Sequence, residues 1–285
     1  MESKAARRMA GVTKELQSIA RAEERRREAA LKAKPVRWKQ ELESRLPEKV
    51  YTGLESAFGK AFSVVFEKGS PILEKTFRKE EILTDHRVSD DAIRRRGSRM
   101  ELRYMKNSAA AANLGNLTLT TVEGIGLGAL GIGIPDIVLF IAALLKGIYQ
   151  TALNYGFDYE TREEQMLILK MMEASLAGGE EWEAKNTEVD RLMISGIGEV
   201  TEEAFRQQMQ RTASAFAMDM LLLKFVQSLA VVGIIGGAAN PIYYQKVMRC
   251  VELKYRKRYL WKILKEARKK LEKKHRKAMP CGAFL

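Results

Sequence analysis

The sequence predicts an all-α protein, a bundle of many helices. Apolar residues recur at intervals of three and four along most of the chain, strand-like alternation is nearly absent, and glycine and proline divide the chain into segments. The chain has 285 residues, of which 46% are hydrophobic, enough for a sizeable core. Two glycine-rich apolar segments, residues 121–158 and 229–247, are expected to form two helical hairpins within this bundle.

Residues 1–35 are expected to form a charged helical arm. Val12, Leu16 and Ile19 repeat at helical spacing, but charged residues dominate the segment around them. This polar bulk argues against membership of the core, so we expect an exposed amphipathic helix.

A helix with one buried face is expected next, ending at Gly69. Its apolar positions are Val50, Leu54, Ala57, Phe58, Ala61 and Val65. Further on, Ser89 offers a capping oxygen, and Asp90 and Asp91 place carboxylates at the positive end of the helix that would follow.

The helical pattern fails between residues 114 and 133, where glycines accumulate, and Pro135 restarts it. The stretch Ile137–Leu145 is apolar on every side, which implies burial all round. Gly156 then suits a left-handed turn.

Thr161 and Glu164 form a capping box for the next helix. Residues 178–198 are polar and predict a loop or a short helix. Helical patterns follow over residues 202–229 and, after the second glycine-rich segment, over residues 243–277.

Gly126, Gly128 and Gly131 match the GxGxxG pattern of dinucleotide-binding loops. That loop requires a strand–helix–strand unit, which the surrounding sequence does not offer. Close packing of helices through small residues is the favoured interpretation.

Charged and polar residues interrupt both apolar segments. Asp136 and Lys146 bracket the apolar run of the first, and Lys224, Gln227 and Asn240 interrupt the apolar stretch from Met220 that includes the second. A membrane span needs about 20 predominantly apolar residues. Buried helices are therefore favoured, and membrane-inserted hairpins are the alternative.

The net charge of +13 is concentrated in two terminal regions. Residues 254–277 hold 13 Lys and Arg against two Glu, and residues 4–45 hold 13 against six acidic residues. Such regions suit anionic lipid. Nucleic acid is not favoured as a partner, because no recognition motif accompanies the charge.

The two cysteines, Cys250 and Cys281, do not indicate a disulfide framework, and the first residues lack an apolar signal core. We therefore expect a cytoplasmic protein. His86 and His275 have no partners at metal-binding spacing, so neither a metal nor a cofactor is expected.

Residues 260–285 are assigned to a basic C-terminal tail and residues 36–259 to the central domain. The tail combines an apolar stripe with lysines and could lie on an anionic membrane; the alternative is a core-packed helix with a solvated end. The candidate membrane-surface residues are Trp261, Lys262, Lys265, Lys269, Lys270, Lys273 and Lys274. The stripe consists of Leu260, Leu264, Ala267 and Leu271.

Polar residues at the borders of the glycine-rich segments are candidates for one functional cleft. They are Thr121, Glu123, Asp136, Tyr155, Asp158 and Asn240. Asp136 begins a wholly apolar helix, where it either favours the helix N-terminus or faces Glu123 as a buried carboxylate. Two carboxylates in a poorly solvated site would raise one pKa and permit acid–base chemistry. The other four have simpler interpretations as capping or turn residues.

Several sequence pieces occur in a specific order: LPEKVYTGLESAF, TTVEGIGLGALGIGIPD, YGFD followed by EEQMLILKMM, GGAAN, and YRKRY. In this combination the chain resembles the EcsC family of bacterial proteins over residues 36–259. The type member of that family is encoded beside an ABC transporter. The resemblance implies a helical, membrane-associated protein with ABC transporter subunits as partners, and it supplies no catalytic residues.

We therefore expect a non-enzymatic binding or regulatory protein at the inner face of the cell membrane, with no small-molecule ligand identified. The alternative is a hydrolase or lipid-modifying enzyme that uses Glu123 and Asp136.

Overall fold

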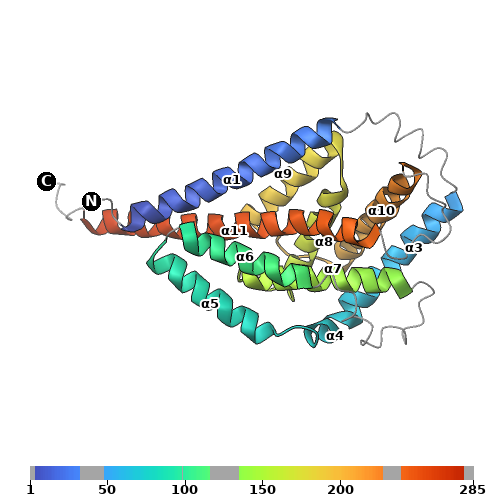
Figure 1. Ribbon diagram of the computed structural model, residues 1–285, viewed down its shortest axis with the longest axis horizontal. Coiled ribbons are helices and arrows are strands. Elements are labelled where there is room, and N and C mark those ends of the chain that lie inside the picture. The colour runs from blue at the N-terminus through green and yellow to red at the C-terminus, as the bar shows by residue number, and fades with distance from the viewer. Residues whose placement is uncertain (1–3, 33–47, 98, 116–134, 227–238, 279–285) are drawn as a thin grey trace.

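The computed structural model describes residues 4–32, 48–97, 99–115, 135–226 and 239–278 (Figure 1). Every regular element among these residues is helical, which confirms the all-α prediction. The elements are α1 (Lys4–Lys32), α3 (Glu48–Val64), the π-helical turn η1 (Val65–Gly69), α4 (Ser70–Glu74), α5 (Lys79–Arg95), α6 (Arg99–Gly115), α7 (Pro135–Asn154), α8 (Arg162–Leu176), α9 (Gly179–Ser195), α10 (Glu202–Val226) and α11 (Ala239–Ala278).

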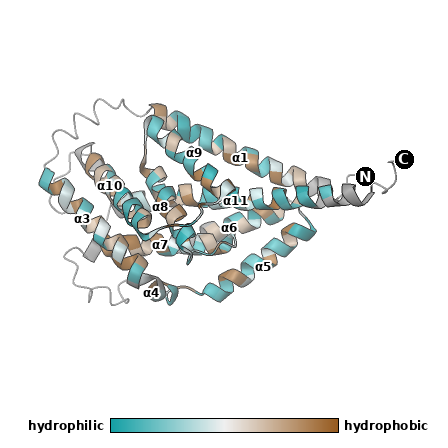
Figure 2. Ribbon diagram, turned by 180° about the vertical axis from the view of Figure 1, so that it is seen from behind, coloured by the Kyte–Doolittle hydropathy of each residue, from teal (hydrophilic) through white to brown (hydrophobic). Residues whose placement is uncertain are grey.

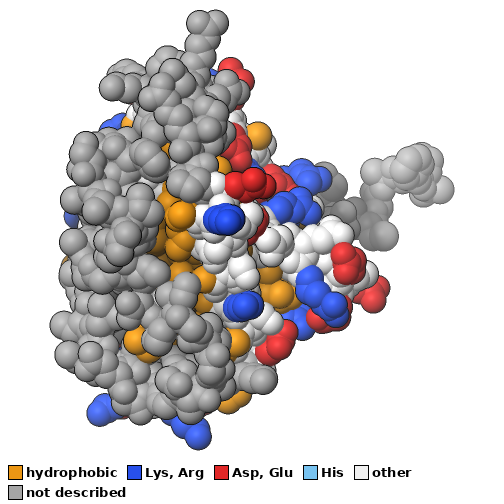
Figure 3. Space-filling view, turned by 90° about the vertical axis from the view of Figure 1, so that its right-hand side faces the viewer, with side chains coloured by type: hydrophobic (Ala, Val, Ile, Leu, Met, Phe, Trp, Pro, Cys, Tyr) orange, Lys and Arg blue, Asp and Glu red, His pale blue; other side chains and the backbone are white. Residues whose placement is uncertain are grey.

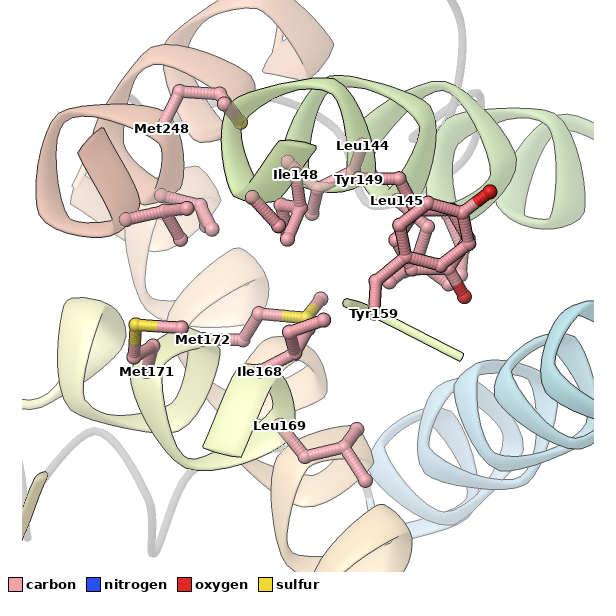
Figure 4. Close-up of a cluster of buried hydrophobic side chains, with 14 of the residues drawn as sticks. Leu144, Leu145, Ile148, Tyr149, Tyr159, Ile168, Leu169, Met171, Met172 and Met248 are labelled. Atoms are coloured by element: carbon pink, nitrogen blue, oxygen red, sulfur yellow. The ribbon is translucent and has the colours of Figure 1, made fainter. Parts of the chain in front are cut away.

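Helices α7 and α8 form the centre of the bundle. Helix α7 packs against α3, α5, α6 and α11, whereas α8 packs against α9, α10 and α11. Hydrophobic residues are densest around α7, and hydrophilic residues dominate α1 and the second half of α11 (Figure 2). Between α7 and α8, the rings of Tyr149 and Tyr159 stack with centroids 4.1 Å apart (Figure 4). The all-round apolar pattern of α7 therefore reflects burial inside the protein.

Among the residues that the structure describes, one helix is long and apolar enough to cross a membrane. Its window is Ile137–Asn154, and 94% of that window is buried in the bundle. Lys146, in the middle of this helix, is buried with it, and desolvation lowers its pKa. A buried core helix can have the length and hydropathy of a membrane span, so these two properties alone do not indicate that α7 crosses a membrane.

Helix α1 packs against α6, α9 and α11 along the side of the bundle. Its outer face is exposed, as its charged composition predicts. The prediction that it stays out of the core is wrong for its apolar stripe, because Val12 and Ile19 are fully buried. The reason is electrostatic: the carboxylates of Glu15 and Glu23 on α1 pair with cations of α11, so α1 can be charged and still pack closely.

The predicted helix start at Ser89 is also wrong. Ser89 lies inside α5, and the chain turns instead at Gly97, whose φ of 63° favours glycine. Asp90 and Asp91 pair one turn further on with Arg94 and Arg95, which explains carboxylates in mid-helix.

Other helix boundaries predicted from the sequence are found in the structure, some of them shifted. Thr161 caps α8 by accepting a hydrogen bond from the backbone amide of Glu164 at 3.3 Å. The polar residues after 178 form a full helix, α9, in place of a loop or short helix. Helix α11 begins at Ala239, earlier than the predicted residue 243.

The start of α7, the end of α10 and the start of α11 lie at one end of the bundle, on the right in Figure 1. The end of α11 lies on the left. Seen from the right, described hydrophobic side chains are visible at this end of the bundle (Figure 3). The start of α1 and the end of α11 both lie at the opposite end (Figure 1).

Candidate functional site

The structure describes part of the predicted cleft. Thr121 and Glu123 lie outside the described residues. Asp136 and Asn240 fall in the first turns of α7 and α11, where only the backbone is described. The meeting of all six residues in one cleft, and with it the enzymatic alternative, stays a prediction.

Tyr155 and Asp158 are described, and the turn between them directs them to different surroundings. Gly156 has a φ of 73° and packs against the ring of His86, as the left-handed turn predicted from the sequence requires. His86 Nδ1 lies 3.0 Å from the backbone oxygen of Asn154, which fixes the ring beside the turn. Asp158 is exposed and accepts a hydrogen bond from the Glu160 amide at 2.9 Å, whereas Tyr155 is only 2% exposed.

Tyr155 lines a cavity of about 820 Å³ between α1, α6, α9 and α11. We call it the basic cavity. This volume lies in the range of small-molecule binding sites. Asp158 is not among the lining residues. Part of the wall is apolar, through Ile19, Ala109 and Leu253.

Buried ion pairs fix the walls of the basic cavity. Lys254 of α11 is fully buried, and its Nζ contacts carboxylate oxygens of Glu23 on α1 at 2.8 Å and of Asp190 on α9 at 2.6 Å. Burial lowers the pKa of Lys254, but the two carboxylates outweigh burial and leave the pKa raised. Lys257 contacts the same two carboxylates, each at 2.6 Å. Three helices are thereby tied together.

Four further cations of the lining make no ion pair with any carboxylate among the described residues. They are Arg25 and Arg26 on α1, Lys106 on α6 and Arg249 on α11. Arg26 Nη2 donates to the backbone oxygen of Ser175 at 3.4 Å, and Arg249 Nη2 to the Gln245 side chain at 3.5 Å. The carboxylates of the lining are Glu23, neutralised by two lysines, and Glu252. The cavity therefore carries an excess of positive charge.

The hydroxyl group of Tyr155 has no hydrogen-bond partner among the described residues. Burial, with the nearby charge of Glu252, raises the pKa of this phenol, so it remains protonated and able to donate. Buried tyrosine hydroxyls usually find a partner. Tyr155 thus brings a donor without a described partner to the lining of the basic cavity.

The second predicted site, the basic end of α11, divides into two faces. Of the predicted stripe, Leu260 and Ala267 are buried, and Leu264 is half-buried and packs against the core. The side chain of Leu271 lies outside the described residues, and Ile263 is buried beside the stripe. The apolar stripe predicted to meet a membrane is therefore largely used by the fold, because α1, α5 and α6 lie alongside it. Trp261 is half-buried, and Lys257 Nζ lies 5.0 Å from its ring centroid.

The opposite face of this part of α11 is exposed. Its described residues are Lys262, Lys265, Arg268, Lys269 and Glu272. We call the four cations among them the outer face of α11. The side chains of Lys270, Lys273 and Lys274 lie outside the described residues.

A clamp of charged groups holds α5 against α11 beside this face. The carboxylate of Asp90 accepts hydrogen bonds from the Tyr259 hydroxyl at 2.7 Å and from Arg94 Nε at 2.5 Å. Arg94 also pairs with Glu266 of α11. This clamp fixes the α5–α6 turn next to the outer face of α11.

Sequence reasoning missed the cations of the basic cavity. The run Arg25–Arg27 was interpreted as part of a solvated arm, although Arg25 and Arg26 line the cavity. The available signal was the apolar stripe of α1, which implies a partner helix beside those arginines. Among the described residues, no group of three or more His, Cys, Asp or Glu could hold a metal ion.

The fold and these sites define a class of protein: an all-helical bundle with a basic cavity and a basic end. Residues 11–260 match the EcsC protein family, and the chain belongs to that family. The match begins within α1, so the family pattern includes most of the helix that the sequence assigned to a separate arm. Neither the comparison with curated proteins nor that with solved structures finds a match.

Proposed function

We propose that this protein is a non-enzymatic binding or regulatory protein that docks on the anionic inner face of the cell membrane through its basic end. One observation carries the proposal: the four cations on the outer face of α11 are exposed and make no ion pair with any described residue. Cations near an anionic bilayer each contribute about 1 kcal/mol of attraction.

This docking is mainly electrostatic. The described part of the apolar stripe packs into the bundle, so little of that part remains to enter lipid. Electrostatic attraction is screened within about 10 Å at 0.1 M salt. Binding should therefore weaken steeply as salt is added.

The α5–α6 turn extends the same end of the molecule. Met100 and Tyr104 of α6 are 72% and 66% exposed, and Arg96, Arg99 and Arg103 lie among them. Arg94 and Glu266 join this turn to α11. Exposed apolar side chains between cations are typical of surfaces that rest in a lipid headgroup region.

Cosedimentation with vesicles tests the proposal. The variant Lys262→Gln/Lys265→Gln/Lys269→Gln should bind vesicles of equal phosphatidylglycerol and phosphatidylcholine about a hundredfold less tightly than wild type at low salt, from three lost contributions of about 1 kcal/mol. Truncation after Tyr259 is unsuitable as a test, because it removes buried Leu260, Ile263 and Ala267.

The matched control is Lys49→Gln/Lys60→Gln/Lys75→Gln. These lysines are exposed on α3 and just after α4, and their replacement changes the net charge equally. The control should bind as wild type does. Equal losses in both variants, or equal binding of wild type to pure phosphatidylcholine, would contradict docking by the basic end.

We propose ABC transporter subunits as the partners that the protein regulates. This part of the proposal is based on the family resemblance. Crosslinking in intact cells of the native host, followed by purification, should recover such subunits with the wild-type chain. Recovery of the chain with lipid alone would remove the transporter from the proposal and leave membrane docking.

A further inference from the structure

The basic cavity differs from a flat docking surface in its shape and its lining. It lies between helices, its walls are fixed by the buried pairs of Lys254, and part of its lining is apolar. A cavity held open by rigid contacts loses little free energy to ordering when a ligand enters. The geometry is that of a preformed binding site.

The positive charge of the cavity favours a negatively charged ligand. Arg25, Arg26, Lys106 and Arg249 come from three helices and have no carboxylate partner among the described residues. Guanidinium groups bind phosphate and carboxylate through paired hydrogen bonds. A group with two or more acidic oxygens could accept from several of these side chains at once.

The apolar wall and the hydroxyl of Tyr155 limit the ligand further. Ile19, Ala109 and Leu253 offer no hydrogen bonds through their side chains, so an entirely polar ion would leave this wall without a partner. The Tyr155 side chain is buried, Tyr155 lines the cavity, and its hydroxyl has no described partner, so it can donate to an acceptor on the ligand.

We propose that the basic cavity binds an anionic amphiphile, with a phosphate-type head group held by Arg25 and Arg249 and an apolar body against Ile19 and Leu253. The Tyr155 hydroxyl donates a hydrogen bond to the same ligand. This binding does not depend on membrane docking, because the cavity and the outer face of α11 share no residue.

Calorimetric titration of the full chain with dodecyl phosphate, below its micelle concentration, tests the proposal. Two further probes separate the parts of the ligand: inorganic phosphate carries the head group alone, and dodecyl maltoside carries the same chain on a neutral head. Dodecyl phosphate should bind at least tenfold more tightly than either. If inorganic phosphate bound as tightly as dodecyl phosphate, the cavity would be a site for free phosphate and the proposed apolar body of the ligand would be wrong. If dodecyl maltoside bound as tightly, the proposed anionic head group would be wrong.

Variants place the binding in the cavity. Arg25→Gln/Arg249→Gln should lose at least tenfold in affinity for dodecyl phosphate, because charge-assisted hydrogen bonds are removed. Both side chains are exposed and free of ion pairs with described residues, so the fold should persist, which circular dichroism checks. Tyr155→Phe, which removes one oxygen, should lose about threefold to tenfold.

Arg191→Gln/Arg206→Gln is the matched control. It removes two exposed arginines of α9 and α10 that do not line the cavity and changes the net charge equally. It should bind dodecyl phosphate as wild type does. If the cavity variant and this control retained equal affinity, the site would lie elsewhere and the proposal would fail.

Discussion

The two halves of α11 look alike in sequence and differ in structure. In the first half, Ala239–Tyr259, four neighbouring cations pair with carboxylates of other helices: Lys254, Arg256, Lys257 and Arg258. In the second half, Leu260–Ala278, the four cations of the outer face have no such pair among the described residues. A lysine or arginine thus acquires its role from the helix that packs beside it. The paired cations of the first half hold the bundle together, whereas the outer face of the second half is exposed to a partner.

Loss of Lys254 should produce the largest effect. Lys254→Gln leaves Glu23 and Asp190 with one lysine between them in a buried setting, and breaking a buried pair costs about 3–5 kcal/mol. Urea denaturation followed by circular dichroism should show this decrease in the free energy of unfolding. A decrease below about 1 kcal/mol would mean that Lys257 alone suffices for both carboxylates, and the contrast between the two halves would weaken.

Arg258→Gln should have the next largest effect. Glu164 of α8 is 7% exposed by side chain, and Arg258 Nη1 contacts both of its oxygens at 2.7 Å. The Tyr255 hydroxyl still donates to Glu164 at 2.8 Å, so we expect a loss of about 2–3 kcal/mol by the same measurement. Adding Glu164→Gln should restore part of that loss, because no buried charge is then left alone. A double variant less stable than the single one would contradict this account.

The clamp between α5 and α11 should respond to acid. Burial raises the pKa of Asp90, but hydrogen bonds from Arg94 and Tyr259 outweigh burial and leave it lowered; Arg94 likewise lowers the pKa of Glu266. Carboxyls with lowered folded-state pKa values stabilise the fold above their ordinary range near pH 4, and this stability is lost as pH falls through the folded-state values. Arg94→Gln should cost about 1 kcal/mol at pH 7 and flatten the decline between pH 5 and pH 3. An unchanged slope would show that the clamp contributes nothing.

Lys265→Gln should have the smallest effect on stability. Its side chain is exposed and unpaired among the described residues, so the free energy of unfolding should stay within about 0.5 kcal/mol of wild type. The same substitution should weaken binding to anionic vesicles about fivefold at low salt. If the variant unfolded more easily but bound vesicles normally, Lys265 would contribute to stability and not to docking, which would contradict the role assigned to the second half of α11.

Local signals in the sequence predicted much of the fold. Thr161, Gly156 and Pro135 each act within one turn of their own position, and each marked a boundary found in the structure. The helix start predicted at Ser89 is wrong because the pairing of Asp90 with Arg94 favours continuation of α5, and the chain turns only at Gly97. Short-range chemistry can be identified from one segment, whereas competition between segments cannot.

The candidate site was harder to predict for the same reason. The basic cavity joins residues of α1, α6 and α11 that are at least 80 positions apart in sequence, and nothing near Arg25 indicates that Arg249 lines the same cavity. Tyr155 was identified because a glycine turn marked it. The partners that make the cavity basic became visible only through the packing of α1.

The length of α11 sets a limit on how the molecule can meet a bilayer. The helix rises about 1.5 Å per residue, so Lys265 lies about 40 Å from Ala239, farther than the roughly 30 Å thickness of the hydrocarbon core. A molecule standing upright on the end of the bundle where α11 begins would therefore hold its outer lysines several Debye lengths from the lipid charges. Contact of that end with lipid and docking of the lysines exclude each other in an upright molecule. They can coexist only when α11 lies parallel to the membrane plane.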